Sequence, residues 1–197
     1  MYDLPTSITI GGKQFNITLK GDYRMILDCF NALNDTDLTE QERIVAALAI
    51  FYEDVESLDT LFEVFNTDDL LTEAIEKMYL FMNLGQEQVG MQVNYELIDW
   101  EGDSQIIMAG INNVAHKEVR AEPYVHWWTF MGYYMSIGQS VLSTVVGIRN
   151  KIVKGKKLDK DEQEFKRDNP QYFMWRKVTK QKMEDDEYAR SIWNSGI

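Results

Sequence analysis

Two adjacent tryptophans within a dense aromatic segment constrain the fold of this chain more than any other feature. The aromatic segment spans residues 122–134 and includes His126, Trp127, Trp128 and Phe130. Neighbouring residues on a helix point roughly 100° apart, so both indoles cannot occupy the centre of one narrow apolar stripe. Large aromatic side chains bury about 150–250 Å² each and dominate cores and interfaces. We therefore expect one indole to face the core, and the other to face a second helix or a partner chain.

Most of the chain shows helical periodicity with recognisable start signals. Asp22 is a candidate N-cap, and Thr39 with Glu42 forms a capping-box pattern ahead of an apolar stripe. Thr67 precedes two aspartates that suit the N-terminal end of a helix dipole. Glycines in the last helical region leave open whether it is one kinked helix or two packed helices. The expected helices cover about residues 23–34, 39–52, 58–65, 67–84, 103–117 and 124–153.

The N-terminal residues predict a β-hairpin. Apolar and polar residues alternate over residues 8–17, on both sides of Gly11 and Gly12. A Gly-Gly pair between alternating segments is typical of a tight hairpin turn. Because a lone hairpin is marginally stable in water, it must pack on helices or extend another sheet.

The expected architecture is therefore mainly α: a helical domain with a small N-terminal β-hairpin and a C-terminal helical extension. We expect the helical domain to cover residues 1–153 and the extension, first basic and then acidic, to cover residues 154–197. Within the extension, a charged connecting segment leads to Pro170, and a terminal helix follows over residues 172–188.

The net charge of −12 is distributed unevenly along the 197 residues. Residues 1–146 hold 7 Lys and Arg against 23 Asp and Glu, whereas residues 147–183 hold 12 against 5 and the last 14 residues hold 1 against 4. Phosphate contacts need a clustered positive surface, so the acidic body argues against nucleic-acid binding. The basic segment is expected to face acidic protein surface, either its own body or a neighbouring subunit.

Residue patterns typical of catalysis or of metal and cofactor binding are missing from the sequence. His116 and His126 lack ligand partners at zinc-site spacings, and no phosphate-binding glycine loop or nucleophile elbow is present. Asp99, Glu101 and Asp103 alternate around a glycine, but the spacing fits a turn and helix N-terminus rather than a calcium loop. We therefore expect no catalytic residue, no cofactor, no metal and no small-molecule substrate.

The single cysteine and the hydropathy pattern indicate the compartment. Cys29 lies among apolar helical positions, so we expect a small buried side chain, no internal disulfide and a reducing compartment. No stretch approaches the roughly 18 uninterrupted apolar residues of a membrane-spanning helix, and the N-terminus lacks a signal-peptide pattern. We therefore expect no membrane association.

The case for function is a case for binding another polypeptide. Tryptophan and tyrosine are enriched among interface hot spots, and helix-in-groove recognition needs anchors at helical spacing. The ten methionines fit either core packing or an adaptable groove for partner helices. The residues that we expect to contact a partner are His126, Trp127, Trp128, Phe130, Tyr134 and Trp175.

The chain resembles the bacteriophage gene-product-fifteen family of tailed phages and prophages. The resemblance covers roughly residues 4–180 and is most specific at the His-Trp-Trp-Thr-Phe sequence of residues 126–130. Between residues 99 and 122 the chain departs from the family pattern. The other matching segments are residues 10–13, 22–24, 38–43, 47–52 and 94–99.

This resemblance implies a role in phage tail morphogenesis. Genes of such proteins resemble those between the major tail protein and the tape-measure protein, which implies a tail assembly chaperone that binds the tape-measure protein and keeps it soluble. The resemblance further implies self-association, a location in the host cytoplasm and absence from the mature virion. Two alternatives stay open: a structural tail or connector component of the virion, and a small enzyme or regulator with an unrecognised site.

Overall fold

The computed structural model describes residues 3–55, 57–86 and 97–175, which form two compact units. The first unit contains Met1–Gly90 and Ile111–Ser136, and the second contains Met91–Gly110 and Ile137–Ile197. The expected division between residues 153 and 154 falls inside the second unit. The described residues are mainly helical with one N-terminal hairpin, which confirms the predicted fold class.

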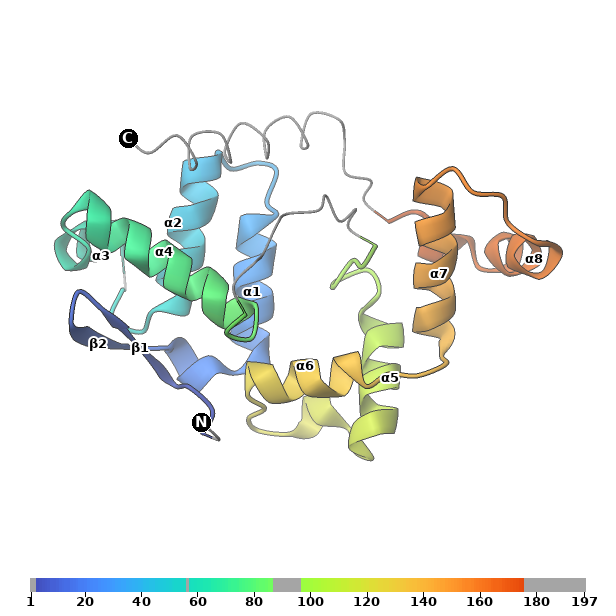
Figure 1. Ribbon diagram of the computed structural model, residues 1–197, viewed down its shortest axis with the longest axis horizontal. Coiled ribbons are helices and arrows are strands. Elements are labelled where there is room, and N and C mark those ends of the chain that lie inside the picture. The colour runs from blue at the N-terminus through green and yellow to red at the C-terminus, as the bar shows by residue number, and fades with distance from the viewer. Residues whose placement is uncertain (1–2, 56, 87–96, 176–197) are drawn as a thin grey trace. The chain divides into compact units, whose positions relative to one another are not determined.

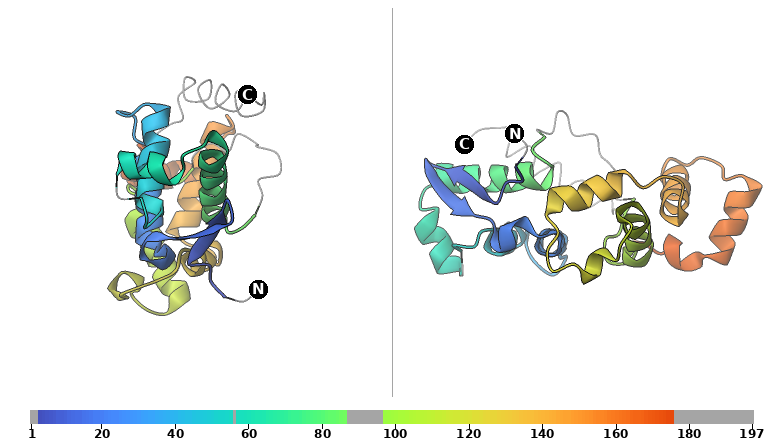
Figure 2. Two further views of the ribbon diagram at one scale, coloured as in Figure 1. Left: turned by 90° about the vertical axis from the view of Figure 1, so that its left-hand side faces the viewer. Right: turned by 90° about the horizontal axis from the view of Figure 1, so that it is seen from below.

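The predicted hairpin is present at the start of the first unit. Strands β1 (Ser7–Ile10) and β2 (Lys13–Asn16) pair antiparallel, with Ile8 opposite Phe15. The hairpin packs on helices, because the Phe15 ring contacts the rings of Tyr52 and Phe65. Figure 2 shows the hairpin beside helix α4. The Gly11 amide at the hairpin turn donates to the Glu73 carboxylate of that helix (2.9 Å).

Four helices follow the hairpin in the first unit. Helices α1 (Tyr23–Leu33) and α2 (Glu40–Phe51) pack side by side, and their contact buries Ile26, Cys29 and Leu48 (Figure 1). The predicted caps are formed, because Asp22 accepts the Arg24 amide and Thr39 completes a capping box with Glu42. The short helix α3 (Leu58–Val64) leads to α4 (Asp68–Met82), which packs on α2 and β1.

The remaining elements belong partly to each unit. The boundary between the units falls inside helix α5 (Ser104–Ala115), and the first unit ends with the 3₁₀ turn η2 (Val119–Ala121) and helix α6 (Trp127–Met135). Helix α7 (Val141–Val153) belongs to the second unit. The region expected as one kinked helix or two helices therefore holds two, α6 and α7.

The second unit corrects the expected course of the C-terminal extension. Residues 160–168, expected as part of a charged connection, form helix α8 (Lys160–Asp168), which Asp159 opens with a capping box to Glu162. The 3₁₀ turn η3 (Pro170–Phe173) then contacts both α7 and α8. Most of the helix expected over residues 172–188 lies outside the described residues.

A tight left-handed turn joins the hairpin to α1. In the 3₁₀ turn η1 (Thr18–Gly21), Leu19, Lys20 and Gly21 all have positive φ angles. A Cβ added to Gly21 would lie 2.8 Å from the Phe81 ring and 3.2 Å from His126 Nε2. The turn therefore requires glycine at position 21 for its backbone conformation and for the space beside it.

We predict that Gly21→Ala destabilises the protein more than Gly12→Ala. Both glycines have φ near +80° (76° and 79°), but Gly12 has nothing within 4 Å of an added Cβ. Gly12→Ala therefore adds only backbone strain, about 1 kcal/mol, and Gly21→Ala adds crowding of about 1–3 kcal/mol more. Urea unfolding of the two variants measures the difference, and equal losses would show that the turn is not packed as described.

Candidate partner-binding site

The two adjacent tryptophans of the aromatic segment both reach the C-terminal end of α4. The Trp127 indole Nε1 donates a hydrogen bond to the Met82 carbonyl (2.9 Å), and the Trp128 indole Nε1 donates to the Phe81 carbonyl (3.0 Å). The last carbonyls of a helix lack partners within the helix. The Phe81 carbonyl also accepts the Leu84 amide (3.0 Å), so the two indoles add to the donors at this helix end. Trp127 is 1% exposed, whereas Trp128 is half-buried.

The prediction that one indole faces the core and the other faces a second helix or a partner chain is confirmed. Trp127 is the first residue of α6 and packs in the core against α1, close to the rings of Phe30 and Phe130. Trp128 faces a second helix, because its ring packs on Phe81 of α4. The Phe130 ring also stacks on Tyr23 of α1, with centroids 4.3 Å apart. The aromatic segment therefore joins α6 to both α1 and α4.

His126 begins α6 and fixes its position against the N-terminal residues. Its Nδ1 accepts the Trp128 amide hydrogen (3.1 Å), so Nε2 carries the ring proton and donates it to the Pro5 carbonyl (2.9 Å). The imidazole is buried, and loss of hydration lowers the pKa of His126 despite the Pro5 contact and the nearby Asp22 carboxylate. His126 is thus a neutral helix cap.

Asp22 and Arg24 hold the loop that leads into the aromatic segment. The buried Asp22 carboxylate caps α1, accepts the Val125 amide (2.9 Å) and forms an ion pair with Arg24. Arg24 in turn donates to the Arg120 and Glu122 carbonyls. The Asp22 carboxylate therefore connects α1 to residues about 100 positions later in the chain. Sequence analysis had identified Asp22 only as a helix cap and as part of a family match.

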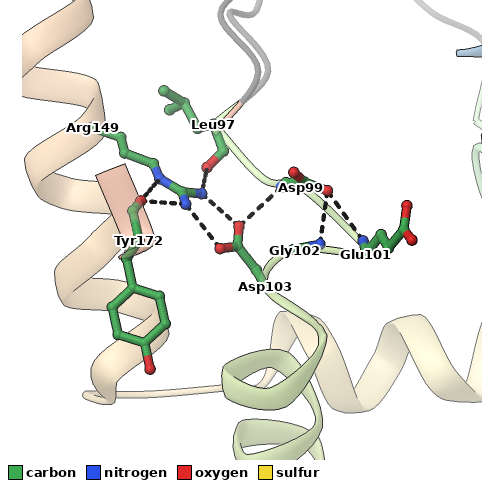
Figure 3. A network of polar contacts seen from close by, with 7 residues as sticks. All are labelled: Leu97, Asp99, Glu101, Gly102, Asp103, Arg149 and Tyr172. Atoms are coloured by element: carbon green, nitrogen blue, oxygen red, sulfur yellow. Dashed lines mark hydrogen bonds and ion pairs between the residues drawn. The ribbon is translucent and has the colours of Figure 1, made fainter. Parts of the chain in front are cut away.

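The second unit contains Trp175, the remaining predicted contact residue. Its buried ring lies 4.8 Å from the guanidinium carbon of Arg149, a residue of α7. Arg149 forms a bidentate ion pair with Asp103, and both side chains are almost completely buried (Figure 3). The guanidinium also donates to the carbonyls of Leu97 and Tyr172, so all five of its N–H groups have acceptors.

Asp103 is oriented by its own turn. One of its carboxylate oxygens accepts the Asp99 amide, and the Asp99 carboxylate accepts the amides of Glu101 and Gly102 (Figure 3). The predicted turn and helix N-terminus are therefore present. The sequence did not indicate that Asp103 pairs with a buried arginine 46 residues away.

The six predicted contact residues have mostly internal positions. His126, Trp127, Phe130 and Trp175 are buried, and Trp128 and Tyr134 are half-buried. Their burial accounts for them as structural residues, and contact with a partner stays a prediction for all six.

Other apolar side chains of the first unit are exposed, and sequence analysis did not select them. Leu19 is 65% exposed on the left-handed turn η1, and Phe62 of α3 is 56% exposed. Tyr79 of α4 and Tyr124 are each 43% exposed. Leu4 (43% exposed) and Met135 (62% exposed) also belong to the exposed apolar surface of the described first unit.

The fold and the aromatic segment define a small helical protein in which a histidine, two tryptophans and a phenylalanine hold the first unit together. The family model of the bacteriophage Gp15 protein matches residues 1–173, and the chain belongs to that family. No curated protein and no solved structure matches the chain.

Two kinds of feature are absent from the described parts of the chain. Within residues 3–55, 57–86 and 97–175, no helix has the length and apolar character needed to cross a membrane. The same residues contain no group of three or more His, Cys, Asp or Glu side chains placed to hold a metal ion.

We predict that Trp127→Ala destabilises the protein by about 3–5 kcal/mol, the usual cost of removing a core tryptophan. The change also leaves the Met82 carbonyl without its indole donor. Trp128→Ala is the matched control, since it removes a half-buried indole with an equivalent hydrogen bond, and it should cost less than half as much. Urea unfolding measures both losses, and a Trp127 loss no larger than the Trp128 loss would contradict the core position of Trp127.

We also predict that the stability of the folded protein depends on pH through His126. Because its pKa is lowered in the folded state, its contribution to stability is present above the ordinary histidine pKa of about 6.5 and is lost as pH falls below it. His126→Asn keeps a cap acceptor that does not titrate. Between pH 7 and pH 5 the free energy of unfolding of this variant should therefore fall less than that of the wild type. The difference is at most about 1.4 kcal/mol per pH unit. His116→Asn, at an exposed position, is the matched control. Parallel unfolding profiles for the wild type and His126→Asn would contradict the prediction.

Proposed function

We propose that this member of a bacteriophage protein family is a tail assembly chaperone, which binds the tape-measure protein and keeps it soluble during tail morphogenesis. The observation that carries the proposal is the family match over residues 1–173. The position that the resemblance implies for the gene, next to the tape-measure gene, supports the same role. A tape-measure protein is a very long, largely helical chain with apolar stripes that need cover before the tail tube forms.

The surface of the first unit supports helix binding. Phe62 and Tyr79 project from two helices, and each has exposed carboxylates on its own helix, Glu63 beside Phe62 and Glu76 one turn before Tyr79. Aromatic anchors with polar surroundings are the usual composition of a helix-binding surface. Strong negative charge also keeps crowded complexes in solution, which many copies on one long partner require.

We further propose that the protein acts by binding and not by catalysis. Burial raises the pKa of the Cys29 thiol to about 12, so the thiol stays protonated at neutral pH and is a poor nucleophile. His126 uses both ring nitrogens to cap α6 and hold Pro5. Two of the side chains most often used in catalysis are therefore engaged in structure.

We predict that co-expression with overlapping tape-measure fragments raises the soluble yield of at least one fragment. Phe62→Ser with Tyr79→Ser should remove most of that gain, because the change deletes two exposed aromatic anchors and leaves the core intact. Glu63→Ser with Glu76→Ser is the matched control on the same two helices and should keep the gain. The measurement is the soluble fraction of each fragment, together with the unfolding midpoint of each variant.

Two outcomes would contradict the proposal. One is the absence of any solubility gain across fragments that cover the whole tape-measure protein. The other is a fixed copy number of this chain in purified virions, measured by mass spectrometry, which would favour a structural tail or connector component.

A further inference from the structure

The left-handed turn η1 presents an apolar side chain from a strained backbone. Leu19 and Lys20 have φ angles of 49° and 54°, and Leu19 is 65% exposed. A left-handed conformation brings the Cβ of most residues too close to backbone atoms, and asparagine tolerates it better than leucine does. Leu19 therefore has neither the conformation nor the burial through which a leucine stabilises a fold.

Two other residues with positive φ have a local explanation that Leu19 and Lys20 lack. Leu84 and His116 follow the ends of helices α4 and α5, where a left-handed residue commonly closes the helix. Leu19 and Lys20 instead precede a helix, and they adopt the left-handed conformation in succession. Backbone strain of this kind persists only where surrounding contacts impose it, and it clusters at sites that bind ligands or partners.

Three hydrogen bonds impose the conformation of η1. The Lys20 amide donates to the Ile17 carbonyl (2.9 Å), and the Asp22 amide donates to the Leu19 carbonyl (3.2 Å). The Tyr124 hydroxyl donates to the Lys20 carbonyl (2.9 Å), and Tyr124 is itself 43% exposed. The turn is thus fixed before a partner arrives, so it loses little conformational freedom on binding.

The charge beside these apolar side chains is positive and unopposed. Lys20 is exposed, and it forms no ion pair with a carboxylate of the described residues, whereas Arg24 and Arg120 in the flanking segments are each paired with one. Leu19, Lys20 and Tyr124 are here called the turn patch. The turn patch combines two exposed apolar side chains with a cation that a carboxylate on a partner can complement.

We propose that the turn patch binds helical segments of the tape-measure protein that carry carboxylates beside their apolar stripe. Positions three and four residues apart lie on one face of a helix. One apolar stripe can therefore cover Leu19 and Tyr124 while a carboxylate one turn away meets Lys20. This contact rests on the proposed function, and it specifies the charge of the segments that the protein selects.

The experiment places asparagine at left-handed positions of the full chain and measures thermal unfolding and calorimetric titration with a tape-measure fragment that the wild type keeps soluble. Leu19→Asn relieves strain and removes the apolar side chain. Its unfolding midpoint should rise by about 2–4 °C, and its affinity for the fragment should fall at least about tenfold. Lys20→Asn relieves the same strain but removes only the charge, so binding should weaken about twofold at low salt and stay unchanged at high salt. His116→Asn, at an exposed left-handed position outside the turn patch, is the control and should bind like the wild type.

Several outcomes would overturn this assignment of the turn patch and leave the proposed function standing. A lower midpoint for Leu19→Asn would show that Leu19 serves the fold, and unchanged fragment binding by that variant would show that the turn patch is not used. Loss of self-association in Leu19→Asn, with fragment binding unchanged, would assign the turn patch to a second copy of this chain. Equal binding by Lys20→Asn at low salt would contradict the acidic character of the partner segment. A wild type that binds no fragment would overturn the proposed function as well.

Discussion

The first unit depends on two indole N–H groups that satisfy the end of another helix. Trp127 and Trp128 donate to consecutive carbonyls, those of Met82 and Phe81, at the C-terminal end of α4, where carbonyls lack partners within the helix. The Phe81 carbonyl also accepts the Leu84 amide. A buried carbonyl left without a donor costs about 1–3 kcal/mol, so α4 and α6 stabilise each other at this point. His126 extends the connection to Pro5, and Asp22 extends it to Val125. One short aromatic segment thereby fixes the N-terminal residues, α1, α4 and α6 together.

The second unit is held together by a different interaction, the buried ion pair of Arg149 with Asp103. Arg149 has all five N–H groups paired, and its acceptors are Leu97 and Asp103 in one segment of the chain and Tyr172 in another. Burial of an ion pair is costly, and removal of one partner usually costs about 3–5 kcal/mol because the other charge is left alone. The planar guanidinium suits this position, since it satisfies a carboxylate and two carbonyls with fixed geometry. Arg149 therefore fixes how residues 97–103 and 172–175 lie on α7.

Local signals in the sequence were sufficient for most elements. The Gly-Gly turn predicted the hairpin, and Asp22, Thr39 and Thr67 predicted the starts of three helices, because these signals act over four residues or fewer. Helix α8 was missed because its charged composition lacks an apolar stripe, although Asp159 with Glu162 is a capping box in the sequence.

The surroundings of the functional candidates could not be obtained from the sequence. The partners of Trp127 and Trp128 are carbonyls 45 and 47 residues away, and backbone carbonyls carry no sequence signature. The exposure of Phe62 could not be obtained either, because periodicity identifies an apolar face but not what covers it. Aromatic content indicated a binding protein, yet most aromatic side chains of the aromatic segment are buried or half-buried. The exposed aromatic residues Phe62, Tyr79 and Tyr124 lie on α3, on α4 and just before α6.

The central claim is that Trp127 belongs to the interior of the first unit, and the proposed partner binding then falls to other residues. Its most direct test is the hydrogen exchange rate of the Trp127 indole N–H, measured by NMR in the free chain and with a soluble tape-measure fragment. The account predicts strong protection in both states, because the N–H is buried and bonded to the Met82 carbonyl. Exchange at the rate of an exposed indole in the free chain, with protection only in the complex, would contradict it.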